Sequence, residues 1–455
     1  GTIQSGGGIK ATVTGNVSNN GGTITAVDSV TIAATGDITA NNGRFTSTNY
    51  DVVLDADGKL TLTDTKVSAK NGVAHLYGTQ GVTIAATQQT KTTTISTNVV
   101  QGIQHDAVAG GVDGDSKAAY FEATSSSGST QTLTTTTWAD STVDAKQIDI
   151  QSSKGGVTID ASDLKASNGI RVSAAQDVKI LAQRGVANST TTVSTGTLQQ
   201  VGGSWDGGGT MELVTSTTDG GSSNQETLRV STLNAGAGTL SIESTGGNIT
   251  GQSAQLAGNK IQLVTTKAQD GTKLDANGNT IAATAGGGSI NLESLQVNGK
   301  TVGLADASTG TSALTTQTLT TVQGTLTATG DDKTGGITIS ANKDVALTAM
   351  DIDAGKGNIH VQAGGNVKLG ANADAEQRNQ TRNTTSGSFF TSTTTNSTYQ
   401  ANEVNAAVTS LSGNNITINA GDSITNYAAQ IDGTGKVLQT AGNSALTYTA
   451  TEVRK

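Results

Sequence analysis

The sequence predicts an all-β fold of one kind, a right-handed parallel β-helix in which each turn of the chain adds one rung to a tube. Three observations predict it: a repeat of about 22 residues, alternation of apolar and polar residues in short segments, and a composition with 59 glycines and no proline. Length alone would suggest several domains. The composition, which is rich in Gly, Thr, Ser, Asn and Ala, is the same from end to end, however, so we expect residues 1–455 to form a single continuous β-helix.

The repeat is clearest where residues 28–49 align with residues 50–71 without a gap, which matches Val30 with Val52. A period of about 22 residues with two or three short strands per unit is typical of one rung of a parallel β-helix. Nearly the same spacing separates later pairs of matching residues: Ile148 and Ile170, Val157 and Val178, Leu240 and Ile261, Ile337 and Ile359, and Val345 and Val367.

Alternation within each unit explains why the rungs would stack. Val, Ile and Leu fall on one face of each short segment, and Thr, Asp, Lys or Ser fall on the other. One rung cannot bury its apolar face, whereas stacked rungs bury it in ladders about 4.8 Å apart. The narrow interior fits the aromatic content of 3%, and strands bonded on both edges fit the absence of proline. The right hand follows from the chirality of parallel crossovers.

Disorder is the main alternative for a polar, glycine-rich chain. Apolar residues make up 33% of the sequence and are patterned, which argues against it.

The absence of cysteine excludes disulfides and thiolate metal sites, and the net charge of −9 argues against a nucleic-acid partner. No apolar run approaches the length of a membrane span. The chain begins within the repeat pattern and shows no signal segment, so we expect it to be an interior fragment.

Four polar stretches interrupt the rungs, at about 88–144, 184–226, 305–333 and 375–403. The large ones have two Thr-rich arms around a Gly-rich middle, as in Thr90–Thr97 and Thr130–Thr137 of the first. Threonine favours strands, so we predict antiparallel hairpins that project from the tube, with disordered loops as the alternative. The spacing of the stretches indicates a super-repeat of about 95 residues, one position of which would carry only a reduced insertion near 266–280.

Residues 155–183, which read GGVTIDASDLKASNGIRVSAAQDVKILAQ, and residues 335–374 repeat a unit of the form GxhxhxAxxDhxhxA. Strand pairs are interrupted by a Ser/Thr-rich insert and resume in a strand such as Lys146–Ile150. In these respects the chain resembles, over nearly its whole length, the filamentous-haemagglutinin-type exoproteins of two-partner secretion. That family includes adhesins and contact-dependent growth inhibition effectors.

The resemblance implies export across the outer membrane by a two-partner-secretion transporter, and a location on the bacterial cell surface or in the medium. It also implies a monomeric rod that can contact a receptor or glycan of a target cell. The family's amino-terminal secretion domain, with its Asn-Pro motifs, is absent. So is the VENN motif that precedes a toxin, for which Asn402–Asn405 is not a substitute.

Some parallel β-helices are polysaccharide lyases or hydrolases, whose sites need clustered carboxylates. Here the acidic residues stand singly, mostly at turn positions such as Asp37, Asp163, Asp177 and Asp344. An aspartate at such a position typically bonds to nearby backbone, and we prefer that interpretation to catalysis. We therefore expect a protein that is not an enzyme, with no catalytic residue, no cofactor and no metal site.

The remaining candidates for chemistry are isolated. Asp113 and Asp115 faintly resemble a Ca²⁺ loop but lack the further ligands of a closed site. His75, His105 and His360 are far apart, and the first and last occupy strand positions opposite the apolar ones, which predicts exposure. Aromatic residues that could contact a partner, but that we expect to pack the inserts onto the tube, are Trp138, Trp205, Phe121, Phe389, Phe390 and Tyr399.

These observations favour a structural rod segment of a large secreted bacterial adhesin or contact-dependent inhibition effector, which extends from the cell and contributes to attachment. A second hypothesis is a biofilm-matrix or surface fibre with no specific receptor. A third is a polysaccharide-active β-helix, which requires a cleft lined by at least two carboxylates that lie close together.

Overall fold

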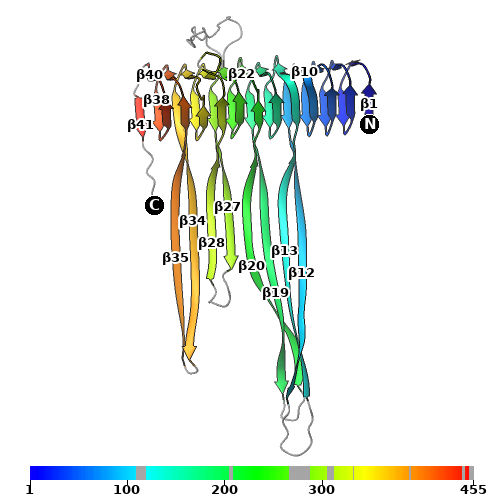
Figure 1. Cartoon of the computed structure of the whole chain (residues 1–455), viewed down its shortest axis with the longest axis vertical. Coiled ribbons are helices and arrows are strands. Elements are labelled where there is room, and N and C mark those ends of the chain that lie inside the picture. Colours follow the sequence, from blue (N-terminus) through cyan, green and yellow to red (C-terminus); the bar gives the residue numbers. More distant parts are fainter. Residues whose placement is uncertain are drawn as a thin grey trace, which may run out of the picture.

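The computed structural model describes residues 1–108, 119–203, 209–265, 287–304, 312–331, 333–388, 391–442 and 446–449. These ranges consist of β-strands joined by turns and contain no α-helix. Most strands are short and stack in parallel, which confirms the predicted parallel β-helix (Figure 1). Nowhere in these ranges is there a helix long and apolar enough to cross a membrane.

Each rung has three strands, so the rod consists of three parallel ladders, with twelve rungs in the described ranges. The first ladder contains β1 (Thr2–Ser5), β4 (Thr23–Ala26), β7 (Arg44–Ser47), the start of β10 (Lys66–Gly78), the start of β14 (Thr142–Ser152), β16 (Asp163–Ala166), β21 (Thr232–Asn234), β24 (Gln255–Gly258), β29 (Thr325–Ala328), β32 (Asp351–Asp353), β36 (Ser410–Gly413) and β39 (Gln430–Gly433). The second contains β2 (Ile9–Val13), β5 (Val30–Ala34), β8 (Val52–Ala56), the ends of β10 and β14, β17 (Ile170–Ala174), β22 (Thr239–Ser244), β25 (Lys260–Thr265), β30 (Gly336–Ala341), β33 (Ile359–Ala363), β37 (Ile416–Ala420) and β40 (Val437–Ala441). The third contains β3 (Val17–Asn20), β6 (Ile38–Asn41), β9 (Lys59–Thr63), β11 (Gly81–Ala85), β15 (Val157–Asp160), β18 (Val178–Leu181), β23 (Ile249–Gln252), β26 (Ile290–Glu293), β31 (Val345–Thr348), the start of β34 (Val367–Ser388), β38 (Ile424–Tyr427) and β41 (Leu446–Thr449).

Inward-facing Val, Ile and Leu side chains line up from rung to rung and form the core. Val30 pairs with Val52 in register, and Ile148 pairs with Ile170, as the repeat predicts. These side chains are buried, as is Phe45, the one phenylalanine in the core of the described ranges. Burial of one such side chain contributes about 1.5–3 kcal/mol relative to exposure. Because no rung closes its own core, this stabilisation depends on the neighbouring rungs.

The tightest turn of each rung is the connection from the third ladder to the first ladder of the next rung, here called the hairpin corner. Where no hairpin is inserted, this corner has two residues, and the first has a positive φ. A left-handed conformation costs a non-glycine residue about 1–2 kcal/mol, so the short corner is strained. All non-glycine residues with positive φ in the described ranges lie at this corner: Asn42, Asp64, Ala161, Ser253, Ala349 and Ala428.

Four antiparallel hairpins leave the rod at alternate hairpin corners, and all project to the same side (Figure 1). They separate two residues that are adjacent in a plain corner: Ala86 and Ser141 flank the first hairpin, whereas Ala161 and Ser162 are neighbours in the next rung. The strands are β12 (Thr87–Val108) with β13 (Ala119–Ala139), β19 (Gln183–Gly203) with β20 (Gly209–Arg229), β27 (Leu295–Leu304) with β28 (Ser312–Val322), and the rest of β34 with β35 (Thr391–Val408).

The hairpin bounds differ from the expected ones, most of all for the third. The expected range 305–333 is wrong at both ends, because the outgoing strand already begins at Leu295 and the return strand ends at Val322. The following segment, 325–328, belongs to the rod. The expected end of the first stretch, residue 144, is also too late, because Val143 is a buried residue of the first ladder.

The hairpins join edge to edge into one eight-stranded antiparallel sheet, here called the hairpin sheet. Its order is β12-β13-β19-β20-β27-β28-β34-β35. Hairpins recur every two rungs, a rise of about 9.6 Å, and a two-stranded hairpin is also about 9.6 Å wide at a strand spacing of about 4.8 Å. The rod therefore presents each hairpin where it can bond to the previous one.

This geometry corrects the super-repeat. The reduced insertion expected near 266–280 lies outside the described residues, and the third hairpin, which is shorter than the others, is formed instead by Leu295–Leu304 and Ser312–Val322. In the chain, residues 266–286 fall between β25 of the second ladder and β26 of the third, and so not between the third ladder and the first. The underlying unit is two rungs plus one hairpin, and it is regular in rungs but not in residues.

Candidate functional site

The hairpin sheet is the part of the molecule that is exposed on both faces, so it is the candidate site. In the described part of β12, residues 88–97 are all exposed, and in β35 so are residues 393–400. Thr, Ser, Asn and Gln dominate these strands, whereas the apolar ladders stay in the rod. The site is thus a single-layer polar sheet held away from the rod.

Buried hydroxyl groups fasten the hairpins at the rod. Ser231, which follows the second hairpin, is fully buried and donates to the Leu181 carbonyl at 2.7 Å. Its Oγ also accepts from the backbone N–H of Ser162, one rung below, at 3.3 Å. Ser141 and Thr409 make equivalent bonds after the first and fourth hairpins. Each hydroxyl thereby satisfies the polar backbone groups that the corner would otherwise bury without partners.

The third hairpin uses the same device from its other side. Ser294, which precedes the hairpin, donates to the Ala349 carbonyl at 2.6 Å and accepts from the Gly324 N–H at 2.8 Å. The return residue here is a glycine, so the outgoing residue supplies the hydroxyl. Both the position of the hydroxyl and its backbone partners therefore differ at this corner, although the hydroxyl again satisfies one carbonyl and one N–H.

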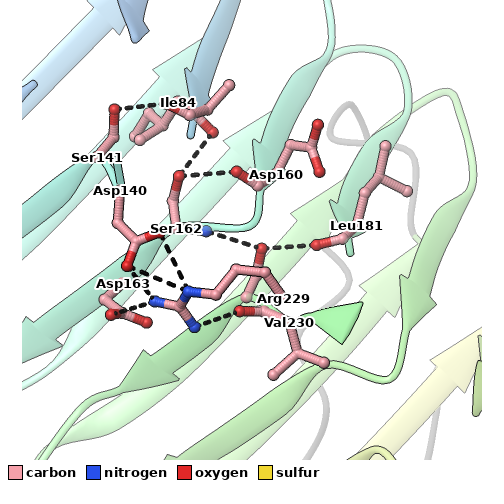
Figure 2. Close-up of polar contacts among 11 residues, drawn as sticks. Ile84, Asp140, Ser141, Asp160, Ser162, Asp163, Leu181, Arg229 and Val230 are labelled. Carbon is pink, nitrogen blue, oxygen red and sulfur yellow. Dashed lines mark hydrogen bonds and ion pairs between the residues drawn. The ribbon is translucent and has the colours of Figure 1, made fainter. Parts of the chain in front are cut away.

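An ion-paired triad ties the first two hairpins together (Figure 2). Arg229, the last residue of β20, contacts Asp140 at 2.8 Å and Asp163 at 2.6 Å through Nη2. It also donates to the Val230 carbonyl at 2.9 Å. The hydrogen bonds to Asp140 raise the pKa of the Arg229 guanidinium, although burial lowers it. The side chains are one-quarter to two-fifths exposed, so this partly buried network fixes the direction in which the hairpins leave the rod.

Side chains also bridge the hairpins near the rod, where their backbones separate. Between β20 and β27 the backbone pairing is described only for residues 222–225 with 299–302. Closer to the rod, the Glu226 carboxylate accepts from both the backbone and the side-chain nitrogen of Asn298, at 2.8 and 3.0 Å. Arg184 then contacts Glu226 at 3.2 Å and donates to the Gln296 carbonyl. Asp374 does the same between the last two hairpins, where it accepts from the backbone and hydroxyl of Thr321.

The turn aspartates lie at the surface of the rod, but their bonds differ from the expected ones. Asp37, Asp177 and Asp344 each accept a hydrogen bond from the backbone of the following rung, as at Lys59 N, 2.8 Å from Asp37 Oδ1. They therefore connect rungs instead of closing their own turns. Asp163 belongs to the triad with Arg229. Asp113 and Asp115 lie outside the described residues.

One histidine belongs to a polar cluster on the outer face of the rod. His75 Nδ1 lies 2.7 Å from the Tyr77 hydroxyl, which donates to Asp149 at 2.8 Å. Arg171 lies 3.9 Å from the same carboxylate. Burial, and then the bond to Asp149, raise the pKa of the Tyr77 phenol above its ordinary value. His75 and His360 lie on the outer face as expected but are only partly exposed; the side chain of His105 is outside the described residues.

The aromatic residues of the hairpins behave differently from one another. The Trp138 ring lies against the next hairpin, because a Cβ added at Gly185 of that hairpin would lie 2.7 Å from it. Tyr399 on β35 has 62% of its surface exposed. The side chains of Phe121, Phe389 and Phe390, and residue Trp205, lie outside the described residues. Packing, where it is seen, is therefore hairpin against hairpin.

The geometry defines a class of protein, a β-helical rod that carries a side sheet of polar hairpins. Residues 121–269, which span β13 to β25, match the family model of the hemagglutinin repeat. This part of the chain is a hemagglutinin repeat, which supports a likeness to filamentous-haemagglutinin-type repeat proteins. No curated protein and no solved structure matches it.

Proposed function

We propose that this chain is a rod segment of a large secreted bacterial surface adhesin or contact-dependent inhibition effector, and that its hairpin sheet contributes to attachment to target cells. The observation that carries the proposal is that the chain has two distinct parts. One is a rod with an apolar core that can extend by the addition of rungs, and the other is a polar sheet that leaves the rod at regular corners. Proteins with the hemagglutinin repeat are typically secreted surface adhesins, which supports the surface location. Export by a two-partner-secretion transporter is part of the proposal.

A bare-rod variant tests this function, because the corners show where each hairpin can be removed. Deletion of residues 87–140, 183–230, 295–323 and 372–408 restores two-residue corners such as Ala86–Ser141, which copy Ala161–Ser162. The rungs and the rod length are unchanged. We expect the purified chain to bind target cells saturably and the bare rod to lose that binding. Equal binding by both would refute a role for the hairpins. Absence of saturable binding by the intact chain would favour the receptor-free fibre.

We also propose that the chain is not an enzyme, and one place deserves a direct assay. Glu376 and Glu403 lie opposite each other across β34 and β35, beside a surface hollow of about 440 Å³ that Arg378 and Tyr399 also line. Glu376 is ion-paired with Arg378, as expected for a surface carboxylate that is not an acid catalyst. Release of reducing ends from a polysaccharide panel that is abolished by Glu376→Gln would overturn the proposal and support the polysaccharide-active alternative.

A further inference from the structure

The opposite face of the hairpin sheet has a second hollow, of about 560 Å³, where β20 and β27 separate near the rod. The register places one row of side chains across five strands beside it. Paired residues in adjacent strands lie on the same face. The row is Asn188, Asn224, Lys300, Gln317 and Gln377.

Three of the five residues in this row, Asn224, Gln317 and Gln377, are carboxamides without a hydrogen-bond partner among the described residues, whereas the Asn188 side chain accepts from the backbone N–H of Gln225. The side chains of Asn224, Lys300, Gln317 and Gln377 make no hydrogen bond with any other described residue, and all four are exposed. A carboxamide carries both donors and acceptors. Adjacent strands are about 4.8 Å apart. Such a row of side chains matches a ligand with regularly repeated groups that can both donate and accept hydrogen bonds.

The next row toward the rod supplies apolar side chains, which form the floor of the hollow, and one carboxylate whose charge is compensated. Val186, Leu319 and Ala375 line the hollow together with Glu226, whose carboxylate is already occupied by Asn298 and Arg184. Lys300 is thus the one free charge in the lining, in a chain whose net charge is −9. The long-range field therefore disfavours polyanions, and the site itself offers hydrogen bonds more than charge.

We infer that this hollow binds a neutral glycan chain that lies across the strands, parallel to the rod. Its hydroxyls would bond to the carboxamide row, and the apolar faces of its sugar rings would rest on Val186, Leu319 and Ala375. The inference rests on the proposed attachment function, for which it names a site and a ligand class. A neutral glycan fits better than a sulfated one, because Lys300 is the single uncompensated positive charge among the described residues that line the hollow.

Binding to three probes tests the inference: maltotetraose, chitotetraose and dextran sulfate, each run over the immobilised intact chain by weak-affinity chromatography. We expect at least one neutral tetrasaccharide to be retained, and dextran sulfate not to be. Gln317→Ala with Gln377→Ala should lower the affinity at least tenfold. The matched control, Thr316→Ala with Gln380→Ala, changes the same two strands on the opposite face and should leave the affinity unchanged.

Retention of neither neutral probe, retention of dextran sulfate alone, or equal effects of the two double variants would each overturn the inference. Ala375→Leu, which fills the floor, is a second blocking variant in case the first disturbs the sheet. Failure of this inference can be distinguished from failure of the proposed function. A chain that loses cell binding in the bare-rod variant but retains no neutral probe keeps its attachment role without this site. Retention of a probe with no cell binding supports the site and refutes the role.

Discussion

Removal of one rung between two hairpins should break the hairpin sheet, although removal of one rung elsewhere should not. Deletion of residues 142–162 joins Ser141 to Asp163, which is in register with Thr142, so the rod itself can close. The first two hairpins would then be one rung apart, about 4.8 Å, whereas a two-stranded hairpin needs about 9.6 Å. The hairpins can no longer lie side by side in one layer.

The magnitude follows from the pairing that is lost. Ten residue pairs join β13 to β19, from Ser126 with Gly196 to Thr135 with Ala187. An antiparallel ladder has about one hydrogen bond per pair. At the lower end of the net value for such bonds, about 0.5 kcal/mol each because the sheet is exposed, the interface is worth about 5 kcal/mol. The loss should be confined to the hairpins.

Hydrogen exchange followed by mass spectrometry measures this directly. In the deletion variant, amides of residues 126–135 and 187–196 that point across the interface should lose their protection, while the rod keeps it. The matched control deletes residues 44–65, a rung before the first hairpin, and joins Gly43 to Lys66, again in register. That variant should keep full protection between β13 and β19. If both variants keep it, the match between rung height and hairpin width does not hold the sheet together.

Three further predictions concern single residues. Ser231→Ala removes a buried hydroxyl with one donated and one accepted bond, and should destabilise the adjacent rungs by about 1–3 kcal/mol in urea unfolding, whereas an exposed serine such as Ser397 should tolerate alanine. Arg229→Met leaves Asp140 and Asp163 facing each other without their cation and should cost about 2 kcal/mol in urea unfolding near neutral pH, and an unchanged free energy of unfolding would contradict the ion-pair interpretation. Because the pKa of Tyr77 is raised in the folded state, its contribution to stability is complete below the ordinary tyrosine pKa of about 10 and is lost as the pH rises above it. Tyr77→Phe should therefore flatten the alkaline fall in melting temperature, and an unchanged fall would refute this role.

The rod could be predicted from the sequence because its determinants are local and repeated. Val30 and Val52 are aligned by spacing alone, and the structure pairs them. The third hairpin was misplaced because its outgoing strand, LQVNGKTVGL, alternates apolar and polar residues as a rung strand does and lacks a threonine run. Its neighbour Thr325–Ala328 is threonine-rich but buries Leu326 in the rod.

Other features depend on residues too distant in sequence for any local pattern. The contact of Arg229 with Asp140 spans 89 positions, and nothing in the composition of either segment indicates it. The union of four hairpins into one sheet follows from counting rungs between hairpins, not residues, and the number of residues between hairpins varies. The carboxamide row likewise exists only once β19, β20, β27, β28 and β34 are placed in register.

The attachment of the hairpin sheet along the rod has a mechanical consequence. The sheet runs parallel to the rod axis and is fixed to it at four places (Figure 1). To bend the rod within the plane of the sheet, strands far from the axis must be pushed together or pulled apart against their hydrogen bonds. To bend it out of that plane, the thin sheet need only twist with it. The molecule should therefore resist bending within the plane of the hairpin sheet and bend more easily out of that plane. A filament built this way can follow a curved surface and still remain extended.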